Sequence, residues 1–262
     1  MGLTVQNRAP FTHRELALIE ALRRLGGSAR STDLARALDV SEETVRRTLK
    51  SLSASGTVER VHGGAYLSGT QNDPSFFRRI AQHSDEKRLI AEHVATMVRD
   101  GMSLFLDVGS TTAFVAEELR QRSNLTVATN SVGVAQALMG VNGNRVHLLG
   151  GEMQSDERGA FGYVTEQQAR RFAFDLAILS ADALTPRNGF LYLSSAEADL
   201  AGVVADNSSR VLVALAHFKY GATAPYCGPD PHKINDMVTD QAPQGPLASA
   251  LEEWGIRTHL AA

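Results

Sequence analysis

From residue 85 onward, short apolar runs alternate with longer amphipathic stretches, and this pattern constrains the fold more than any other feature. Apolar runs of this length suit buried strands, and apolar residues at helical spacing suit helices packed on one side. Buried strands that alternate with helices are typical of a doubly wound α/β sheet, which we predict for residues 85–262. The predicted strands are 103–107, 125–128, 146–149, 176–179, 211–215 and 237–239, and the predicted helices are 87–98, 113–120, 132–139, 166–172, 196–205 and 247–254.

Residues 1–67 carry a different pattern, that of three short helices and a hairpin. Thr12 and Glu15 have the spacing of a capping box at the start of the first helix. Ser31 and Ser41 are expected to cap two further helices, joined by a tight turn at residues 39–40. Such a helix pair is a helix-turn-helix, and two β-compatible runs flanking Gly63 and Gly64 predict a wing.

Charge is unevenly distributed along the chain. Residues 1–66 hold ten Lys and Arg against seven Asp and Glu, whereas the remainder holds sixteen against twenty-two. A basic segment of this kind suits a polyanion, and the first turns of a recognition helix reach base edges in the major groove. Arg46 and Arg47 could instead be a solvated face. The residues predicted to meet DNA are Ser31, Thr32, Ser41, Glu43, Thr44, Arg46, Arg47, Lys50, Arg60, His62 and Gly63.

Small and polar residues follow three predicted strands, at 107–112, 129–131 and 150–152. In open α/β sheets ligands bind outside the carboxyl ends of the strands. Small residues let main-chain N–H groups approach an anion at a helix start, so a phosphate with several hydroxyls fits this composition. The alternative for each loop is that its polar residues only cap helices and its glycines only turn corners.

Several classes of protein are not favoured. The sequence contains no phosphate-binding P-loop, no dinucleotide-binding glycine motif after a strand, no nucleophile elbow and no metal-ligand spacing. Its single cysteine, Cys227, cannot form an internal disulfide. No apolar run approaches the length of a membrane span, and residues 1–10 do not resemble a secretory signal. We therefore expect a cytoplasmic protein with neither metal nor cofactor.

Two segments of residues 1–67 resemble the DeoR family of bacterial transcriptional regulators. Residues 40–49 read Val-Ser-Glu-Glu-Thr-Val-Arg-Arg-Thr-Leu, and residues 59–65 read Glu-Arg-Val-His-Gly-Gly-Ala. The pair is similar to the winged-helix signature of that family. One position departs from it, because Thr48 stands where the family has an aspartate.

The second part of the chain also resembles this family, in its effector domain. The matching pieces are residues 107–112, 129–131, 149–151, 197–198, 219–221 and 236–240. The resemblance implies an α/β fold of the ribose-phosphate isomerase and glucosamine-phosphate deaminase type, and a sensor for a phosphorylated sugar. Two departures stand out: Ala201 and Gly202 replace two basic residues, and His217 and Phe218 lie where the family has an Asp-x-Ser segment.

By this resemblance residues 110–112 would cradle the phosphate, Asp107 and Asn130 would face hydroxyls, and Lys219 would supply a positive charge. The predicted ligand-binding residues are Asp107, Gly109, Ser110, Thr111, Thr112, Thr129, Asn130, Ser131, Gly150, Gly151, Asp182, Glu197, His217 and Lys219.

Together these patterns predict a repressor of a carbohydrate-catabolic operon. Residues 1–67 would bind double-stranded operator DNA, 68–84 would be a linker, and 85–262 would sense a phosphorylated sugar. The chain would act as a homo-oligomer, a dimer or a tetramer, because operators present two half-sites. Two alternatives stay open. One is a sugar-phosphate isomerase or deaminase with an accessory DNA module, since Asp107, Glu152, Asp182, Glu197 and His217 could move protons. The other is an architectural DNA-binding protein with an inert second domain.

Overall fold

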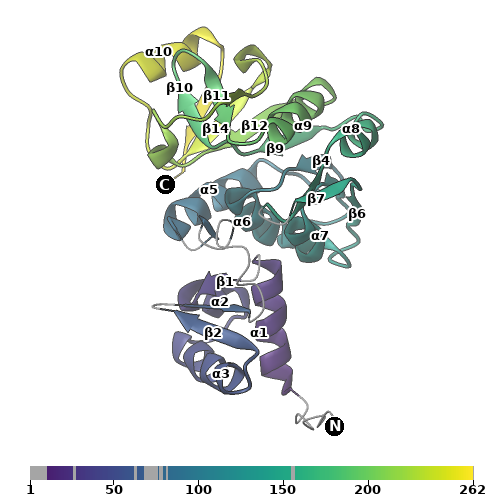
Figure 1. Ribbon diagram of the computed structural model, residues 1–262, viewed down its shortest axis with the longest axis vertical. Helices are drawn as coiled ribbons and strands as arrows, with labels where there is room; N and C mark the ends of the chain where they lie inside the picture. Colours follow the sequence, from purple (N-terminus) through teal and green to yellow (C-terminus); the bar gives the residue numbers. More distant parts are fainter. Residues whose placement is uncertain are drawn as a thin grey trace, which may run out of the picture. The chain divides into compact units, whose positions relative to one another are not determined.

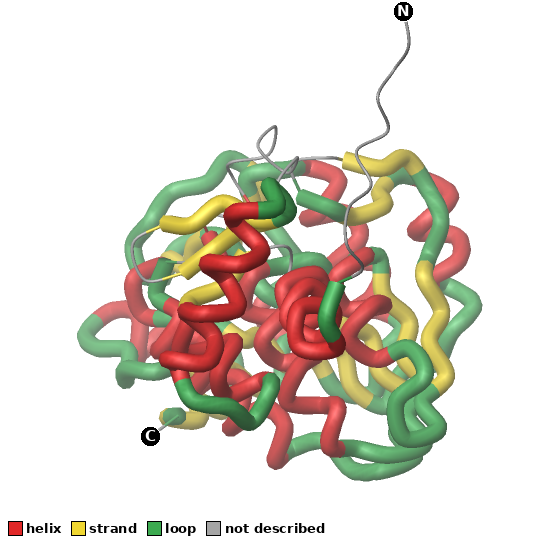
Figure 2. Tube along the Cα trace, turned by 90° about the horizontal axis from the view of Figure 1, so that it is seen from below, coloured by secondary structure: helices red, strands yellow, loops and turns green. Residues whose placement is uncertain are grey.

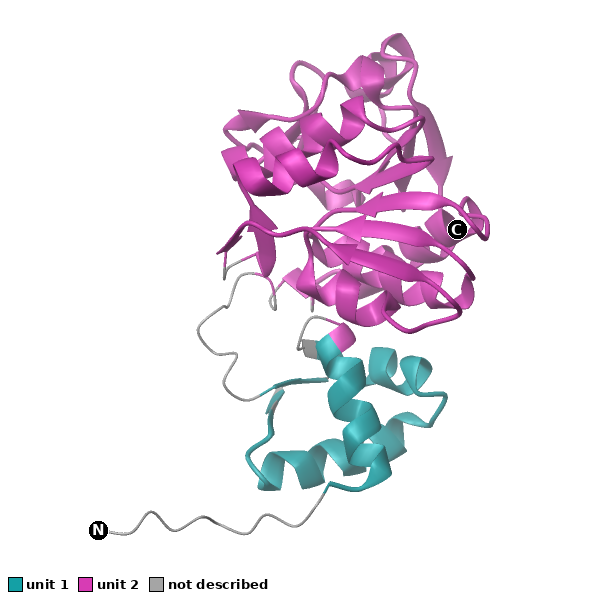
Figure 3. Ribbon diagram, turned by 90° about the vertical axis from the view of Figure 1, so that its right-hand side faces the viewer, with its two compact units in different colours: residues 1–23, 27–72 teal, residues 24–26, 73–262 magenta. Residues whose placement is uncertain are grey.

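The structure is a computed structural model that describes residues 11–25, 28–61, 64–67, 76, 79–80, 82–154 and 157–261 (Figure 1). The chain divides into two compact units, residues 1–23 with 27–72 and residues 24–26 with 73–262 (Figure 3). His62 and Gly63, and most of the predicted linker 68–84, lie outside the described residues. None of the helices among the described residues is both long and apolar enough to span a bilayer.

The N-terminal part is a winged helix-turn-helix, as predicted. Strands β2 and β3 form the antiparallel hairpin, and β1, which the sequence did not predict, pairs with the other side of β3. The helices bury their apolar faces beneath this sheet, including Leu22, Leu34, Leu49 and Leu52. The elements are α1 (His13–Arg24), β1 (Ser28–Arg30), α2 (Ser31–Ala37), α3 (Glu42–Ala54), β2 (Val58–Val61) and β3 (Gly64–Leu67).

Two of the three predicted helix caps are confirmed. Thr12 N donates to Glu15 Oε2 at 2.8 Å while Glu15 N donates to Thr12 Oγ1 at 3.3 Å, and Thr44 N donates to Ser41 Oγ at 3.3 Å. The cap at Ser31 is wrong. Strand β1 runs directly into α2, so the residue before the helix is Arg30, and Ser31 becomes its first, buried residue.

The second unit is built on a seven-stranded parallel sheet with strand order β15-β14-β12-β9-β4-β5-β6. These strands are β4 (Ser103–Leu106), β5 (Thr126–Thr129), β6 (Arg145–Leu148), β9 (Leu176–Leu179), β12 (Val211–Ala214), β14 (Asp236–Thr239) and β15 (Arg257–Leu260). The doubly wound α/β prediction is confirmed, and β15 is an addition to it.

Both faces of the sheet are covered by helices, because side chains of a strand alternate between its faces. Phe105 packs with the apolar side chains of α8, α9 and α10, whereas Leu104 and Leu106 pack with those of α5, α6 and α7. Figure 2 shows the helices in red around the yellow strands. The helices are α5 (Ser84–Thr96), α6 (Ser110–Glu118), α7 (Val132–Leu138), α8 (Tyr163–Ala169), α9 (Ser195–Asp206) and α10 (Pro246–Glu253).

The strand order reverses between β4 and β9. The chain moves outward from β4 through β5 to β6, then returns to place β9 on the other side of β4 and moves outward again through β12 and β14. Smaller antiparallel pieces fill the connections: the hairpin β7 (Glu152–Gln154) with β8 (Gly159–Phe161), and the sheet of β10 (Ala183–Thr185), β11 (Gly189–Tyr192) and β13 (Tyr226–Cys227). Three 3-10 turns are η1 (Leu119–Gln121), η2 (His217–Lys219) and η3 (Pro231–Lys233).

Candidate functional site: a cavity at the strand-order reversal

A cavity lies at the carboxyl ends of β4, β5 and β9. A parallel sheet opens a crevice where its strand order reverses, since the loops of neighbouring strands leave in opposite directions. The lining residues are Arg79, Phe105, Asp107, Val108, Gly109, Ser110, Asn130, Glu157, Phe161, Ser180, Ala181, Asp182, Tyr192, Glu197, Leu200, Ala201 and Lys219.

The loop after β4 needs a glycine for close approach to the loop after β9. A Cβ on Gly109 would lie 2.5 Å from Ser180 Oγ and 3.1 Å from Thr112 Oγ1. The backbone of Gly109 is extended, with φ 174°, so the requirement is space and not an unusual conformation. The glycine therefore lets the start of α6 lie against the cavity.

The N-terminus of α6 is left without a side-chain cap, in contrast to that of α7. Among the described residues, no side chain accepts a hydrogen bond from the first turn of α6, whereas Ser131 Oγ accepts from Val134 N at 3.3 Å and caps α7. The first N–H groups of a helix have no partner within it and attract anions. Since Gly109 and Ser110 line the cavity, these amides can receive an anionic group there.

Asp107 connects the ends of β4 and β9, between which the strand order reverses. Its Oδ2 accepts a hydrogen bond from Ser180 N at 2.7 Å, and Ser180 Oγ donates to the same oxygen at 3.2 Å. Burial raises the pKa of Asp107 to about 7, although the hydrogen bonds from Ser180 oppose this shift. The carboxyl is thus able to gain or lose a proton near neutral pH.

Both cations of the cavity are already engaged by the protein. Lys219 Nζ donates to the carbonyl oxygen of Ala181, and burial lowers the pKa of this ammonium, against the attraction of Asp182. Arg79 forms a bidentate ion pair with Glu157, in which Nη1 donates to Oε1 at 3.2 Å. The positive charge at the cavity is therefore largely balanced before any ligand arrives.

The backbone around Arg79 is held by a buried lysine. Lys87 on α5 is 1% exposed, and its Nζ donates to the carbonyl oxygens of Arg79 and of Gln82, the latter at 2.8 Å. A buried ammonium is tolerated where carbonyl oxygens replace its water. This contact brings a residue from before α5 to the cavity.

Two polar groups in the wall made by β11 and α9 lack partners. The Tyr192 hydroxyl is buried without a hydrogen bond, and no residue of the described chain hydrogen-bonds or ion-pairs with Glu197. Burial raises the pKa of Glu197 to about 8, and the nearby negative charge of Glu157 adds to this. Burial also raises the pKa of Tyr192.

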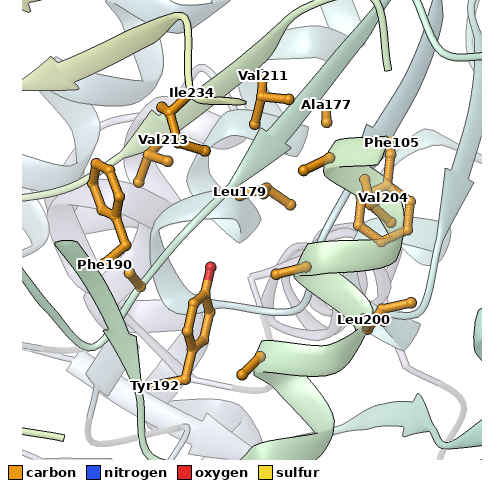
Figure 4. Packing of buried hydrophobic residues seen from close by; sticks show 14 of the residues in the cluster. Phe105, Ala177, Leu179, Phe190, Tyr192, Leu200, Val204, Val211, Val213 and Ile234 are labelled. Carbon is orange, nitrogen blue, oxygen red and sulfur yellow. The ribbon is translucent and has the colours of Figure 1, made fainter. Parts of the chain in front are cut away.

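The Tyr192 ring is held by close packing. A Cβ on Gly228 would lie 2.3 Å from Tyr192 Cε2, so the chain can pass the ring only with a glycine at this position. Figure 4 shows Tyr192 and Phe190 on one strand, with the helix that bears Leu200 and Val204 alongside. The ring belongs to the apolar core while its residue lines the cavity.

Half of the predicted ligand-binding residues come together at the cavity. They are Asp107, Gly109, Ser110, Asn130, Asp182, Glu197 and Lys219. Asn130 is held in place from both sides, because its Oδ1 accepts from Val108 N at 3.1 Å and its Nδ2 donates to the carbonyl oxygen of Ala160 at 3.2 Å. Asp182 Oδ2 accepts from Leu193 N at 2.9 Å.

The other half lies outside the lining, and most of these residues serve local structure. Thr112 Oγ1 donates to Asp107 O at 3.0 Å, Thr129 Oγ1 accepts from Ser131 N at 3.0 Å, and His217 pairs with Asp240. For the loop after β5, the capping alternative therefore describes Thr129 and Ser131. The residues outside the lining are Thr111, Thr112, Thr129, Ser131, Gly150, Gly151 and His217.

Four polar lining residues were not predicted, namely Arg79, Glu157, Ser180 and Tyr192. Ser180 follows the predicted strand 176–179 directly, so its position at a strand end was a usable signal. The other three reach the cavity from elements with no recognisable motif.

The candidate DNA surface lies on α3 and β2. Arg46, Arg47, Lys50 and Arg60 are exposed. Arg46 Nη2 lies 3.1 Å from Glu42 Oε2, whereas Arg47, Lys50 and Arg60 have no polar partner among the described residues. Thr32, Ser41 and Glu43 are also exposed, Thr44 is half-buried, and Ser31 is buried, which removes its side chain from such a surface.

Thr48 does not orient the arginines in place of the absent aspartate. Its Oγ1 donates to the carbonyl oxygen of Thr44 at 2.9 Å, along the helix. The acidic partner of Arg46 is instead Glu42, one turn earlier on the same helix.

Comparison with known proteins agrees with both halves of this description. Residues 14–71 match the DeoR-like helix-turn-helix domain, and residues 82–241 match the DeoR C terminal sensor domain. The chain belongs to the DeoR family. It contains both domains of these transcriptional regulators, and the cavity lies within the sensor domain.

Two relatives illustrate the similarity of this DeoR-family protein. The glycerol-3-phosphate regulon repressor of Escherichia coli (strain K12) is 29% identical over 249 residues, which cover 95% of this chain and 98% of the relative. The HTH-type transcriptional repressor CsqR of the same organism is 30% identical over 260 residues, covering 99% and 98%. Both are named as repressors, which does not favour the isomerase or deaminase alternative.

Among solved structures, a ribose 5-phosphate isomerase A from Methanocaldococcus jannaschii is 18% identical, with a TM-score of 0.40 over 53% of this chain and 55% of that chain.

Proposed function

We propose that this DeoR-family protein represses a carbohydrate-catabolic operon and that a phosphorylated sugar bound in the cavity controls its affinity for the operator. The observation that carries the proposal is the uncapped N-terminus of α6, which opens on a cavity at the strand-order reversal. Main-chain amides at such a helix end bind phosphate. The metabolites that suit this cavity are those that carry one phosphate and several hydroxyls.

The phosphate would lie at Gly109 and Ser110, where the amides of the first turn and the Ser110 hydroxyl can donate hydrogen bonds. Asn130 and Asp182 would face the hydroxyls, since an amide oxygen and a carboxylate accept hydrogen bonds from O–H groups. Lys219 would add positive charge to the cavity, but its ammonium would not contact the phosphate directly.

The exposed side chains of α3 and β2 would bind the operator, with Arg46 and Arg47 toward base edges and Lys50 and Arg60 toward phosphates. We infer a homo-oligomer, a dimer or a tetramer, whose two helix-turn-helix units meet half-sites about 34 Å apart. A sugar phosphate that binds one arrangement of the oligomer more tightly would shift operator affinity. No turnover of the sugar phosphate is part of this proposal.

The test uses the full chain and DNA from upstream of its own gene and of the neighbouring genes. Mobility-shift titrations should identify a fragment bound specifically. A panel of sugar phosphates should then change its affinity, and the same compounds should raise the melting temperature, because a ligand that binds only the folded state stabilises it. Absence of any specific fragment, or of any active compound, contradicts the proposal, and measurable turnover contradicts its non-enzymatic part.

Variants at two lysines connect the response to the cavity. Lys219→Met, which removes the charge and keeps most of the length of the side chain, should reduce the response to the sugar phosphate and leave operator binding unchanged. Lys233→Met is the matched control, because Lys233 is about half exposed in its ion pair with Asp206, outside the cavity. Equal responses from both variants contradict the placement of the ligand.

A further inference from the structure

The wall of the cavity formed by β11 and α9 carries two polar side chains without a hydrogen bond among the described residues. The Tyr192 hydroxyl is buried without a partner, and Glu197 lines the same cavity without a hydrogen bond to the described chain. Native proteins rarely leave a buried polar group unpaired, and such a group in a cavity is satisfied by what binds there.

The two groups complement a hydroxyl-bearing ligand. The Tyr192 O–H can donate to a ligand oxygen, and its own oxygen can accept. The Glu197 carboxyl can accept from a ligand O–H when ionised and can donate when protonated. A pair of neighbouring hydroxyls therefore satisfies both side chains in either protonation state of Glu197.

No free cation lies at this wall. The α9 residues beside Glu197 that line the cavity are Leu200 and Ala201, both apolar. The two cations of the lining are held by Ala181 O and by Glu157. A second phosphate or a carboxylate on the ligand would therefore approach Glu197 and Asp182 without a partner, at a high cost in a buried site.

We propose that Tyr192 and Glu197 form a specificity subsite that binds the uncharged hydroxyl end of a sugar or polyol monophosphate and excludes bisphosphates and phosphorylated sugar acids. The inference rests on the proposed function, which places the single phosphate at α6. Tyr192 and Glu197 would bind hydroxyls of the ligand, and the apolar Leu200 and Ala201 offer no partner to a second anionic group. The ring of Tyr192 is held for this task by its contact with Gly228.

Matched pairs of compounds test the charge rule on the full chain. Calorimetry should compare fructose 6-phosphate with fructose 1,6-bisphosphate, glucose 6-phosphate with 6-phosphogluconate, and glycerol 3-phosphate with 3-phosphoglycerate. In the pair whose monophosphate binds, this monophosphate, which carries no second charged group, should bind at least about 10-fold more tightly than its charged partner. If a bisphosphate or a phosphorylated acid binds equally well or better, the inference fails while the proposed function stands. If no compound of any pair binds, both fail.

Side-chain variants test the subsite itself. Tyr192→Phe and Glu197→Ala should each weaken binding of the active monophosphate by about 10-fold or more, because a ligand hydroxyl loses its partner. Asp199→Asn, on the exposed side of the same helix, is the matched control and should bind normally. Affinities that stay unchanged in both subsite variants overturn the inference.

A gain of function completes the test. Ala201→Lys would place a cation at the apolar wall. It should increase the affinity for the charged compound of the pair by about 10-fold, so the difference in affinity between the two compounds becomes smaller. Melting curves of each variant without ligand show whether it is folded. Should Ala201→Lys not fold, Leu200→Gln offers a polar change at the same wall, and it should weaken the exclusion less. A charged partner that gains nothing from either change contradicts the role of this wall.

Discussion

The exposed face of α3 and the cavity of the sensor domain use charge in opposite ways. On α3, Arg47 and Lys50 are exposed and have no polar partner among the described residues. In the cavity, Lys219 and Arg79 are tied to the protein by hydrogen bonds and an ion pair. Interactions of exposed charges are screened by salt beyond about 8–10 Å, whereas buried or partly buried pairs are screened much less.

This difference suits the two ligands that we propose. Duplex DNA is a polyanion that releases counterions when cations approach, so free surface cations bind it. A small metabolite is recognised by exact pairing of its polar groups in a closed site. The difference also means that each function can be changed without the other.

The largest effect is expected from Arg47→Ala on operator binding. Loss of a base or phosphate contact from the recognition helix costs about 1–3 kcal/mol, roughly 5- to 150-fold in affinity. Mobility-shift titration at two salt concentrations measures it, and the slope against salt should fall if the lost contact is with a phosphate. Arg187→Ala, an exposed arginine of the sensor domain, is the control.

The same Arg47→Ala protein should keep the melting-temperature increase that the active sugar phosphate produces. A loss of that increase would show that the two functions are not separable in the way the comparison predicts. Unchanged operator affinity would remove α3 as the recognition helix.

Gly109→Ala should weaken effector binding and leave operator binding unchanged, the opposite of Arg47→Ala. The new Cβ would lie 2.5 Å from Ser180 Oγ, so the Ser180 hydroxyl must move and its hydrogen bond to Asp107 is disturbed. We expect effector affinity to fall by about 10-fold and stability to fall by about 1 kcal/mol, with operator affinity unchanged. Calorimetry and mobility shift on the same preparation measure both, and Gly202→Ala, where a Cβ meets nothing within 4 Å, is the control.

Stability should depend on pH through the cavity. The pKa values of Asp107 and Glu197 are raised to about 7 and about 8, so between about pH 4 and these values the folded protein keeps protons that the unfolded chain has lost. Folding is therefore favoured at the acid end of this range, and stability falls as the pH rises toward 8. Without ligand, the melting temperature should decrease from pH 6 to pH 8.5.

Asp107→Asn should flatten that decrease, because the amide does not titrate. Arg47→Ala should leave it unchanged. A melting temperature that rises over the same interval, or a slope unaltered by Asp107→Asn, would contradict the assignment of the pH dependence to the cavity.

The smallest effect is expected from Thr111→Val. The Thr111 hydroxyl is buried without a partner and lies outside the lining, so replacing it by a methyl group of similar shape should leave effector affinity unchanged and alter stability by less than about 1 kcal/mol. The variant therefore distinguishes the contribution of the main-chain amides of α6 to ligand binding from that of the Thr111 side chain. A clear loss of the effector response would assign this hydroxyl to the ligand.

Much of the architecture could be predicted from the residues because it depends on local rules. Short apolar runs and helical periodicity located the six predicted strands and the helices that cover them, and the capping box at Thr12 and the cap at Ser41 located the starts of α1 and α3. The cap at Ser31 failed because an unpredicted strand, β1, pairs with β3 and runs into α2. Pairing with a distant strand is not encoded in the local pattern.

The sequence by itself determined the two modules, the six predicted strands with the helices between them, and the polar strand ends at Asp107 and Asn130, because periodicity, capping and turn chemistry act between near neighbours. Only the tertiary structure decided which polar residues meet. It assigned Thr129 and Ser131 to local hydrogen bonds, left the start of α6 uncapped, and brought Arg79 and Tyr192 to the cavity. These outcomes follow from the reversal of strand order between β4 and β9, which juxtaposes loops far apart in the chain.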